Sequence, residues 1–298
     1  MIPGNEDSNA ELTLLQVVGM NAGETLLWAT RKLVHIAERP HLEAELLLME
    51  LLRCDRATLF AHPEGELDPT QMRHYAESVR RRAEGTPLPY ITGHIEFFGL
   101  EFAVTPAVLI PRPETELLVE RAVKWLQEHP SRRIADIGTG SGCIAVTLAV
   151  MRRTLHIAAG DISAAALAVA QTNAQHHDVA SRVTCIQADL LTPFSGPLDL
   201  ILSNPPYVAD PVWEQLPDSV RQEPRAALLA GPRGLDLIRR LLSQARHRLA
   251  PGGCMLVEIG EEQENAVQTL AQTAFPRACI NVLPDLAGKP RLLEVIVT

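Results

Sequence analysis

The chain has 298 residues, which is enough for about two domains of ordinary size. Apolar residues make up 46% of it, so a sizeable buried core is expected, and no apolar run approaches the ~18 residues of a membrane-spanning helix. The formal net charge of −9 argues against a large basic surface for nucleic acid.

The cysteines and the start of the chain indicate the compartment. Five scattered cysteines without a C-x-x-C pair are typical of reduced thiols and give neither a disulfide framework nor a zinc site. The first ten residues are polar and acidic, which does not fit a signal peptide. The adjacent pair His176-His177 stands in no metal-binding pattern. We therefore expect a cytoplasmic protein with no bound metal.

Residues 24–84 carry apolar side chains at helical spacing, first around Leu26 and Leu33 and again over residues 43–53. Asp68-Pro69 supplies an N-cap and a proline at the first position of a further helix. Short helices need each other's apolar faces, so we predict a small helical domain over residues 1–86. Its dense basic cluster, Arg73 with residues 80–82, is either a solvated helix face or a contact for an anionic partner.

Residues 87–108 change in character. The segments 90–91, 95–98 and 102–104 are rich in β-forming residues around a Gly99-Leu100 turn, which predicts a β-hairpin linker over residues 87–108. In the next segment, 109–116, two prolines hold the chain extended before a helix that begins near Glu114 or Thr115.

After residue 117 the pattern alternates between strand and helix, which predicts a parallel sheet with helices on both faces. The last two strands are joined by too few residues for a helical crossover and must be antiparallel. We therefore predict an α/β, Rossmann-like domain over residues 109–298, mostly parallel with an antiparallel C-terminal hairpin. Its strands are expected at 134–137, 156–160, 183–187, 198–202, 255–259, 279–283 and 292–297, with helices such as 164–173 and 235–249 between them.

A glycine-rich loop follows the first of these strands and opens a helix. Glycines there let the backbone turn sharply and approach a ligand. Cys143 stands where a dinucleotide fingerprint has its third glycine, and the loop lacks the lysine of a phosphate-binding loop. Alone, the loop is ambiguous between dinucleotides and other nucleotide-like ligands, and its spacing disfavours a dinucleotide. Its candidate binding residues are Gly138, Thr139, Gly140, Ser141 and Gly142.

Three carboxylates narrow the choice of ligand. Asp161 ends the second strand about 20 residues further on, where it can accept both ribose hydroxyls. Asp189 ends the third strand and suits an exocyclic amine, beside Leu190, which can pack on the face of adenine. Asp136, just inside the loop, could face a cationic amino-acid group. Together they favour an adenosine with a positively charged tail, which is S-adenosylmethionine.

The motif Asn204-Pro205-Pro206-Tyr207 ends the fourth strand. The prolines hold the backbone extended and remove two donors, so the Pro205 carbonyl and the Asn204 side-chain oxygen remain as fixed acceptors beside an aromatic ring. Such a clamp orients the lone pair of a planar –NH2 group and favours the pyramidal nitrogen of a methyl-transfer transition state. We assign Asn204, Pro205 and Tyr207 to catalysis, the same residues with Pro206 to substrate binding, and Asn204 also to the cofactor site.

These motifs, with residues 93–99, 109–116 and Glu223-Pro224 followed by Ala226 and Leu228, closely resemble those of the peptide chain release factor glutamine methyltransferase (HemK/PrmC) family. The resemblance implies methyl transfer from S-adenosylmethionine to the glutamine amide in the Gly-Gly-Gln motif of class I release factors. It places residues 138–142, Asp161 and Asp189 at the cofactor, and Arg112 and Phe98 near its methionine end.

Other readings compete with this one. An amino-methyltransferase acting on adenine or guanine in nucleic acid uses the same clamp, but the acidic balance and the lack of a basic stripe weigh against it. A catalytically inactive cofactor-binding protein is disfavoured, because it would have no use for the clamp. A nicotinamide oxidoreductase is disfavoured, because this chain lacks the third glycine of the dinucleotide fingerprint and carries the clamp. We expect release factors as partners, and we expect no nucleic-acid substrate, no membrane association and a monomeric state. The helical domain is expected to dock the release factor, because it is the part of the chain without cofactor chemistry. Which release factor is preferred stays open.

Overall fold

The structure is a computed structural model, and it describes residues 19–129 and 133–298. The chain forms two compact units, a helical unit that ends at Gly93 and a sheet unit, His94–Thr298. The acidic start, which was expected not to be a signal peptide, lies outside the described residues. Within the described ranges, no helix is both long enough and apolar enough to cross a bilayer.

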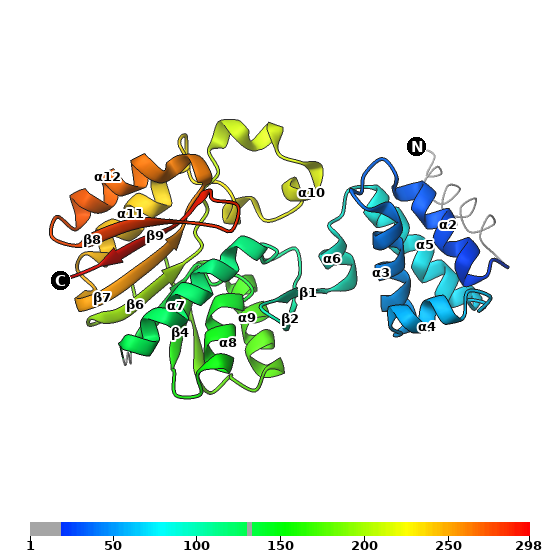
Figure 1. Ribbon diagram of the computed structural model, residues 1–298, viewed down its shortest axis with the longest axis horizontal. Coiled ribbons are helices and arrows are strands. Elements are labelled where there is room, and N and C mark those ends of the chain that lie inside the picture. The colour runs from blue at the N-terminus through cyan, green and yellow to red at the C-terminus, as the bar shows by residue number, and fades with distance from the viewer. Residues whose placement is uncertain (1–18, 130–132) are drawn as a thin grey trace, which may run out of the picture. The chain divides into compact units, whose positions relative to one another are not determined.

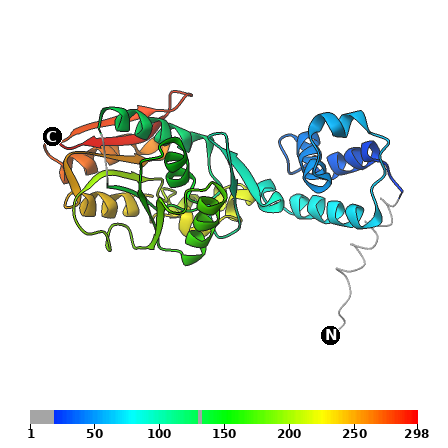
Figure 2. The same ribbon diagram turned by 90° about the horizontal axis from the view of Figure 1, so that it is seen from below.

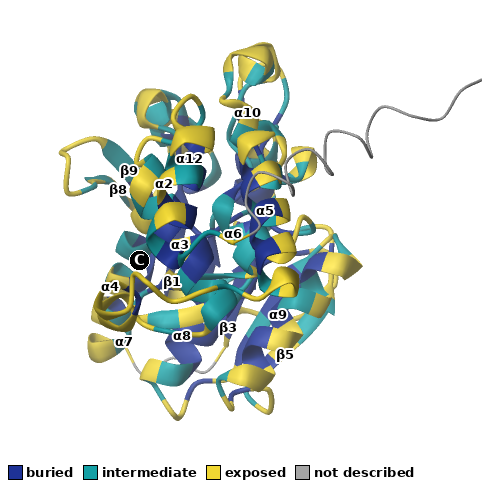
Figure 3. Cartoon of the chain, turned by 90° about the vertical axis from the view of Figure 1, so that its right-hand side faces the viewer, coloured by how far each residue is buried: buried dark blue, intermediate teal, exposed yellow. Residues whose placement is uncertain are grey.

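The helical unit is a bundle with one apolar core. Two helix starts carry a capping box, in which Asn21 and Asp68 each bond the first turn that follows. The core gathers Leu33, Leu48 and Tyr75, while exposed residues lie on the outer helix faces (Figure 3). Helices α2, α3 and α5 pack side by side (Figures 1 and 2). The helices are α2 Ala22–Leu33, α3 Pro40–Leu52, α4 Arg56–Ala61, α5 Pro69–Ala83 and α6 Leu88–Thr92.

The arginine cluster on α5 is bound within its own unit. Arg80 pairs with Glu77 and Glu84 over 2.7 and 2.6 Å. Arg82 is buried against Glu43 at 2.5 Å, and Arg81 donates to the carbonyl of Tyr90. Arg73 donates to the hydroxyl of Thr70. These contacts support the structural interpretation of the cluster over an open site for an anion.

The predicted hairpin is shorter than expected. Its strands are β1, His94–Phe97, and β2, Leu100–Ala103, paired antiparallel. The expected strand at residues 90–91 is wrong, because these residues lie in α6. Proline in the first turn and Gly93 at φ +83° after the last one favour a helix there over the β propensity of two residues.

The hairpin belongs to the core of the sheet unit. Phe97 and Phe102 are buried in the same cluster as Ile144 of α8. The amide of Ala103 donates to the side chain of Asn173 over 2.7 Å. The segment that was expected to be a linker is therefore anchored, from His94 onward, to the helices of the sheet unit.

The sheet has seven strands in the order β5-β4-β3-β6-β7-β9-β8 (Figure 1). The first four pairs are parallel, and β9 runs antiparallel to β8, as predicted. Strand β9 is also antiparallel to β7. Apolar, largely β-branched or aliphatic runs suit strands that are buried on both faces. The strands are β3 Ile134–Ile137, β4 Ile157–Asp161, β5 Val183–Gln187, β6 Leu198–Ser203, β7 Leu249–Glu258, β8 Cys279–Pro284 and β9 Pro290–Ile296.

Helices cover both faces of this sheet, and alternate residues of the strands pack into two separate cores. The first core holds α7 Glu116–Glu128, α8 Cys143–Met151 and α9 Ala164–His176, and the second holds α11 Asp236–Ala245 and α12 Glu264–Ala274. Short helical turns occupy the connections: η1 Pro113–Thr115, η2 Asp210–Gln215, α10 Asp218–Arg221, η3 Arg225–Ala227 and η4 Glu261–Gln263.

The topology places two of the predicted motifs next to each other. Strand β3 pairs with β4 on one side and with β6 on the other, so the strand order reverses at β3 and β6. Ligands of open α/β sheets bind at the carboxyl ends of the strands at such a reversal. Ile137 pairs with Ser203, whose hydroxyl donates to the Ile137 carbonyl over 2.7 Å. The glycine loop and the Asn-Pro-Pro-Tyr motif therefore begin side by side.

Candidate active site

The glycine loop has the conformation that its glycines allow. Gly138, Gly140 and Gly142 have φ angles of +72°, +54° and +81°, which other residues rarely adopt. A Cβ on Gly142 would lie 3.0 Å from the Cβ of Ala170, whereas one on Gly140 would meet nothing within 4 Å among the described residues. Gly142 is therefore required for packing against α9, and Gly140 leaves open room beside the loop.

Asp161 holds this loop and keeps acceptor capacity. One oxygen accepts the amide of Gly140 and the other the amide of Ser163, both over 2.9 Å. A carboxylate oxygen has two lone pairs, so each can accept one bond more. Ile162 comes next and is 65% exposed, although it is large and apolar. Sequence reasoning missed Ile162; the available signal was an apolar residue directly after a strand-end carboxylate.

Asp189 and Leu190 lie on a loop that α11 holds in place. Asp189 is half exposed and pairs with Arg240 over 2.6 Å. Gln244, one turn further along α11, accepts the amide of Leu191 over 2.8 Å. Leu190, which stands between Asp189 and Leu191, has a φ of +54° and is partly buried. No local sequence pattern pointed to Arg240 or Gln244, because they lie more than one element away from the loop.

Asp136 lies in β3, just before the glycine loop. Its side chain is fully buried, and the Thr139 hydroxyl donates to its Oδ2 over 2.6 Å. Burial raises the pKa of Asp136 to about 7, the Asp161 charge adds to this rise, and the Thr139 hydrogen bond opposes it. Its Oδ1 is also buried, and no described residue donates to it, so the expectation that Asp136 faces a cationic group stays a prediction.

The side chain of Asn204 offers an acceptor without a donor. Its Nδ2 donates to the Thr115 hydroxyl over 3.0 Å. Its Oδ1 is buried, and no described residue donates to it. Buried polar atoms nearly always have a partner, so an unpartnered oxygen at the carboxyl end of β6 marks the place of an absent donor. The role of this oxygen as the acceptor for a substrate –NH2 group stays a prediction.

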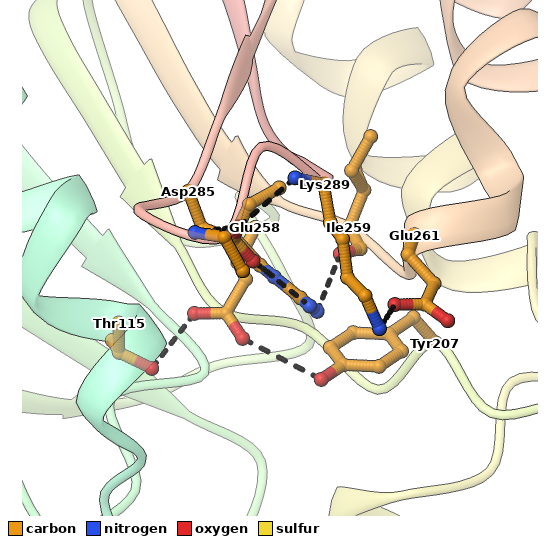
Figure 4. Close-up of polar contacts among 9 residues, drawn as sticks. Thr115, Tyr207, Glu258, Ile259, Glu261, Asp285 and Lys289 are labelled. Carbon is orange, nitrogen blue, oxygen red and sulfur yellow. Dashed lines mark hydrogen bonds and ion pairs between the residues drawn. The ribbon is translucent and has the colours of Figure 1, made fainter.

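A buried carboxylate stands behind the clamp (Figure 4). Glu258, at the end of β7, is 1% exposed. Its Oε2 accepts the Thr115 hydroxyl over 2.7 Å, and its Oε1 faces the Tyr207 hydroxyl at 3.5 Å. Sequence reasoning missed Glu258; the available signal was a charged residue at the end of an apolar strand.

Burial also determines the acidities in this network. It raises the pKa of Glu258 to about 7, while the Thr115 hydrogen bond and the Arg291 charge oppose the rise. It raises the pKa of Tyr207 to about 12, with the Glu258 charge adding to the rise. Tyr207 is therefore a neutral phenol near neutral pH, and Glu258 is poised to titrate.

Arg112 is engaged by a second buried carboxylate. Its guanidinium contacts Glu223, which is 4% exposed and also accepts the amide of Ile110 over 3.0 Å. The Arg112 charge opposes the rise that burial causes in the pKa of Tyr207. The other residue placed by resemblance, Phe98, has a φ of +54° and donates its amide to Glu116.

Among the described residues, no three side chains of His, Cys, Asp or Glu gather to hold a metal.

The strand order, the glycine loop after β3 and the Asn-Pro-Pro-Tyr clamp after β6 define a class I methyltransferase. The family model described as "PrmC N-terminal domain" matches residues 24–93, and the one described as "Methyltransferase small domain" matches residues 113–218. The catalytic domain of hMettl16, solved with a MAT2A 3'UTR hairpin, has the same fold, with a TM-score of 0.55 at 19% identity over 74% of this chain and 81% of that chain.

Closer relatives cover both units. The release factor glutamine methyltransferase of Moorella thermoacetica is 48% identical over 255 residues, 85% of this chain and 90% of the relative. The enzyme of the same name from Koribacter versatilis is 44% identical over 262 residues, again 85% and 90% of the two chains. The chain therefore belongs to the release factor glutamine methyltransferase family, as its motifs predicted.

Proposed function

We propose that this chain transfers the methyl group of S-adenosylmethionine to the side-chain amide nitrogen of the glutamine in the Gly-Gly-Gln motif of class I release factors. The observation that carries the proposal is the buried Oδ1 of Asn204, which has no hydrogen-bond partner among the described residues and lies beside the glycine loop at the reversal of the strand order. The names of the relatives support the choice of substrate.

The residues present fit the methyl donor. The open room beside Gly140 and the spare acceptor sites of Asp161 suit a nucleoside with two ribose hydroxyls. The carboxylate oxygen of Asp189 that does not face Arg240 would accept the adenine amine, with the apolar Leu190 and Ile162 on the base. Thr139 and Ser141 would complete the loop, with Asp136 accepting a hydrogen bond from the Thr139 hydroxyl. When bound, S-adenosylmethionine supplies a methyl group that is electrophilic because it is attached to a sulfonium.

The clamp provides the remaining chemistry. An amide nitrogen is a poor nucleophile, because its lone pair is delocalised. Asn204 Oδ1 and the Pro205 carbonyl would accept its two N–H groups, with Pro206 and Tyr207 bordering the amide, and so direct the lone pair at the methyl carbon. The new N–C bond would form as the C–S bond broke with its electron pair on sulfur, and the nitrogen would then lose one proton to solvent. A nitrogen that gains a methyl group becomes acidic, so no strong base is needed.

We also infer that the acceptor is a protein and not a nucleic acid. The net charge of −9 and the internal pairing of Arg80 and Arg82 leave little basic surface for a phosphate backbone. The helical unit, which carries none of the cofactor residues, is proposed to dock the release factor. A monomeric state and a cytoplasmic location stay predictions.

One experiment tests the acceptor directly. Purified protein is incubated with S-adenosylmethionine and either a release factor or a mixture of tRNA and DNA, and both products are analysed by mass spectrometry. We expect a single added methyl group on the Gly-Gly-Gln glutamine and unmodified nucleic acid. Methylated nucleic acid with an unmodified release factor would establish the alternative acceptor.

A further inference from the structure

We propose that Thr115 and Glu258 are positioning residues that hold the side-chain amide of Asn204 with its oxygen, and not its nitrogen, toward the reacting –NH2 group. The inference rests on the proposed methyl transfer and deepens it. The two ends of an asparagine side chain are almost the same size, so shape alone does not select one orientation. Only one orientation gives the clamp an acceptor.

The order of hydrogen bonds selects that orientation. The Thr115 hydroxyl lies 2.7 Å from Glu258 Oε2 and 3.0 Å from Asn204 Nδ2. A hydroxyl has a single proton, and an ionised carboxylate only accepts. Thr115 therefore donates to Glu258 and turns a lone pair toward Asn204, where only the –NH2 end of the amide can donate. The Oδ1 end is left facing the place of the substrate.

The opposite charge state removes this selection. A protonated Glu258 can donate to Thr115, whose own proton is then free to turn to the oxygen of a flipped Asn204 amide. In the flipped amide, the Nδ2 group would meet the two N–H groups of the substrate, donor against donor, and the clamp would be lost. The charge of Glu258 thus determines whether these hydrogen bonds hold the clamp as an acceptor.

The surroundings of Glu258 allow it to change charge near neutral pH. Burial raises its pKa to about 7. Glu114 of η1 acts in the same direction, whereas the Arg291 charge of β9 and the Tyr207 hydroxyl act against it. We therefore expect the clamp to gain its acceptor as the pH rises through about 7.

A purely structural role explains these two side chains poorly. Thr115 precedes α7, whose first turn lies wholly within the described residues. Its hydroxyl makes no capping hydrogen bond to that turn. A buried carboxylate in an apolar strand costs stability unless it is fully partnered, and an apolar residue of similar size often packs as well or better. Both groups are explained by the direction that they impose on Asn204.

The test compares five variants with the wild type, the fifth being the control Glu294→Gln. Thr115→Val removes the hydroxyl at nearly constant shape, Thr115→Ser restores it, and Glu258→Gln removes the charge. Thr147→Val is the matched control, because Thr147 is equally buried and its hydroxyl has no partner among the described residues. Measured for each are kcat, KM for the acceptor, S-adenosylmethionine affinity by calorimetry, and the dependence of kcat on pH.

We expect Thr115→Val to lower kcat by ~10-fold or more while the affinity for S-adenosylmethionine stays within about twofold. Thr115→Ser should recover most of the loss, and Thr147→Val should match the wild type. Glu258→Gln should lower kcat and remove the rise in kcat near pH 7, whereas Glu294→Gln, a change at another buried carboxylate of the sheet, should keep that rise.

An unchanged kcat in Thr115→Val, or a loss that Thr115→Ser does not recover, overturns the inference. So does an unaltered pH profile in Glu258→Gln. The ratios of variant to wild type are measured on whichever –NH2 acceptor the wild type methylates. If the wild type does not methylate the release factor but methylates another –NH2 acceptor, that result counts against the proposed function. The variant ratios on that acceptor then still test this inference.

Discussion

The side-chain amide of Gln263 donates a hydrogen bond to the carbonyl oxygen of Tyr207 over 3.0 Å. The same –NH2 group donates to the carbonyl of Gly234 over 3.1 Å, and its Oε1 accepts the amide of Gly260 over 3.0 Å. One side chain thus joins the clamp to two other segments. The Tyr207 carbonyl also lies so close to Gly234 that a Cβ there would be 2.1 Å from it.

This close approach predicts that Gly234→Ala disturbs the clamp. The added methyl group must displace the Tyr207 carbonyl, so we expect kcat to fall by ~10²-fold or more, because misplacement by about 1 Å has effects of this size. Gly252→Ala is the control: Gly252 has a similar φ of +71° against +67°, and a Cβ there meets nothing within 4 Å among the described residues. It should cost about 1 kcal/mol of stability and keep its kcat. Equal kcat values in the two variants would contradict the prediction.

Asn204→Ala should remove half of the clamp. We expect kcat to fall by ~10²-fold, the usual cost of losing one preorganised group that acts in the transition state, with little change in S-adenosylmethionine affinity. Steady-state kinetics and calorimetry separate the two effects. Asn265→Ala, an exposed change on α12, serves as the control and should behave as the wild type. Normal turnover in Asn204→Ala would remove Asn204 from the mechanism.

Arg240→Ala should weaken cofactor binding without affecting chemistry. Arg240 fixes Asp189 from α11, but both side chains are about half exposed, and such pairs contribute only about 0–1 kcal/mol. The Kd for S-adenosylmethionine, measured by calorimetry, should therefore rise by only about two- to fivefold. The neighbouring Arg239 pairs with Asp236 within the same helix, so Arg239→Ala should leave the Kd unchanged. The same Kd in both variants would show that the Asp189–Arg240 pair plays no part in cofactor binding.

Asp136 should make stability fall as the pH rises. Its pKa is about 7 in the folded chain and near 3.8 in the unfolded one, so between these values the folded state binds more protons. This contribution is fully present below about pH 4 and is lost as the pH rises through about 7. At ~1.36 kcal/mol per pKa unit, the free energy of unfolding of the wild type relative to Asp136→Asn should drop by about 2–3 kcal/mol between pH 5 and pH 8. Urea unfolding at the two pH values measures it, and parallel curves for the two proteins would refute the assignment.

Much of the fold follows from local patterns. The alternation of strands and helices predicted the parallel sheet, and the short connection before β9 predicted the antiparallel end, because both depend on periodicity and connection length. The prediction failed at residues 90–91, where β-forming side chains lie in α6. Proline and glycine at the two ends of that helix outweighed the propensity of its middle.

The candidate site divides in the same way. The sequence by itself identified the glycine loop and the Asn-Pro-Pro-Tyr motif as candidates, because each is a run of neighbouring residues whose backbone chemistry is local. It identified Asp161 as a candidate because this carboxylate ends the next strand at a typical spacing from the loop. The direction of the Asn204 amide was decided only by the tertiary structure. Its partner Thr115 is 89 residues away in the chain, and Glu258 is 143 residues beyond Thr115. A hydrogen bond takes its direction from the group that it meets, and only the folded sheet brings these three side chains together.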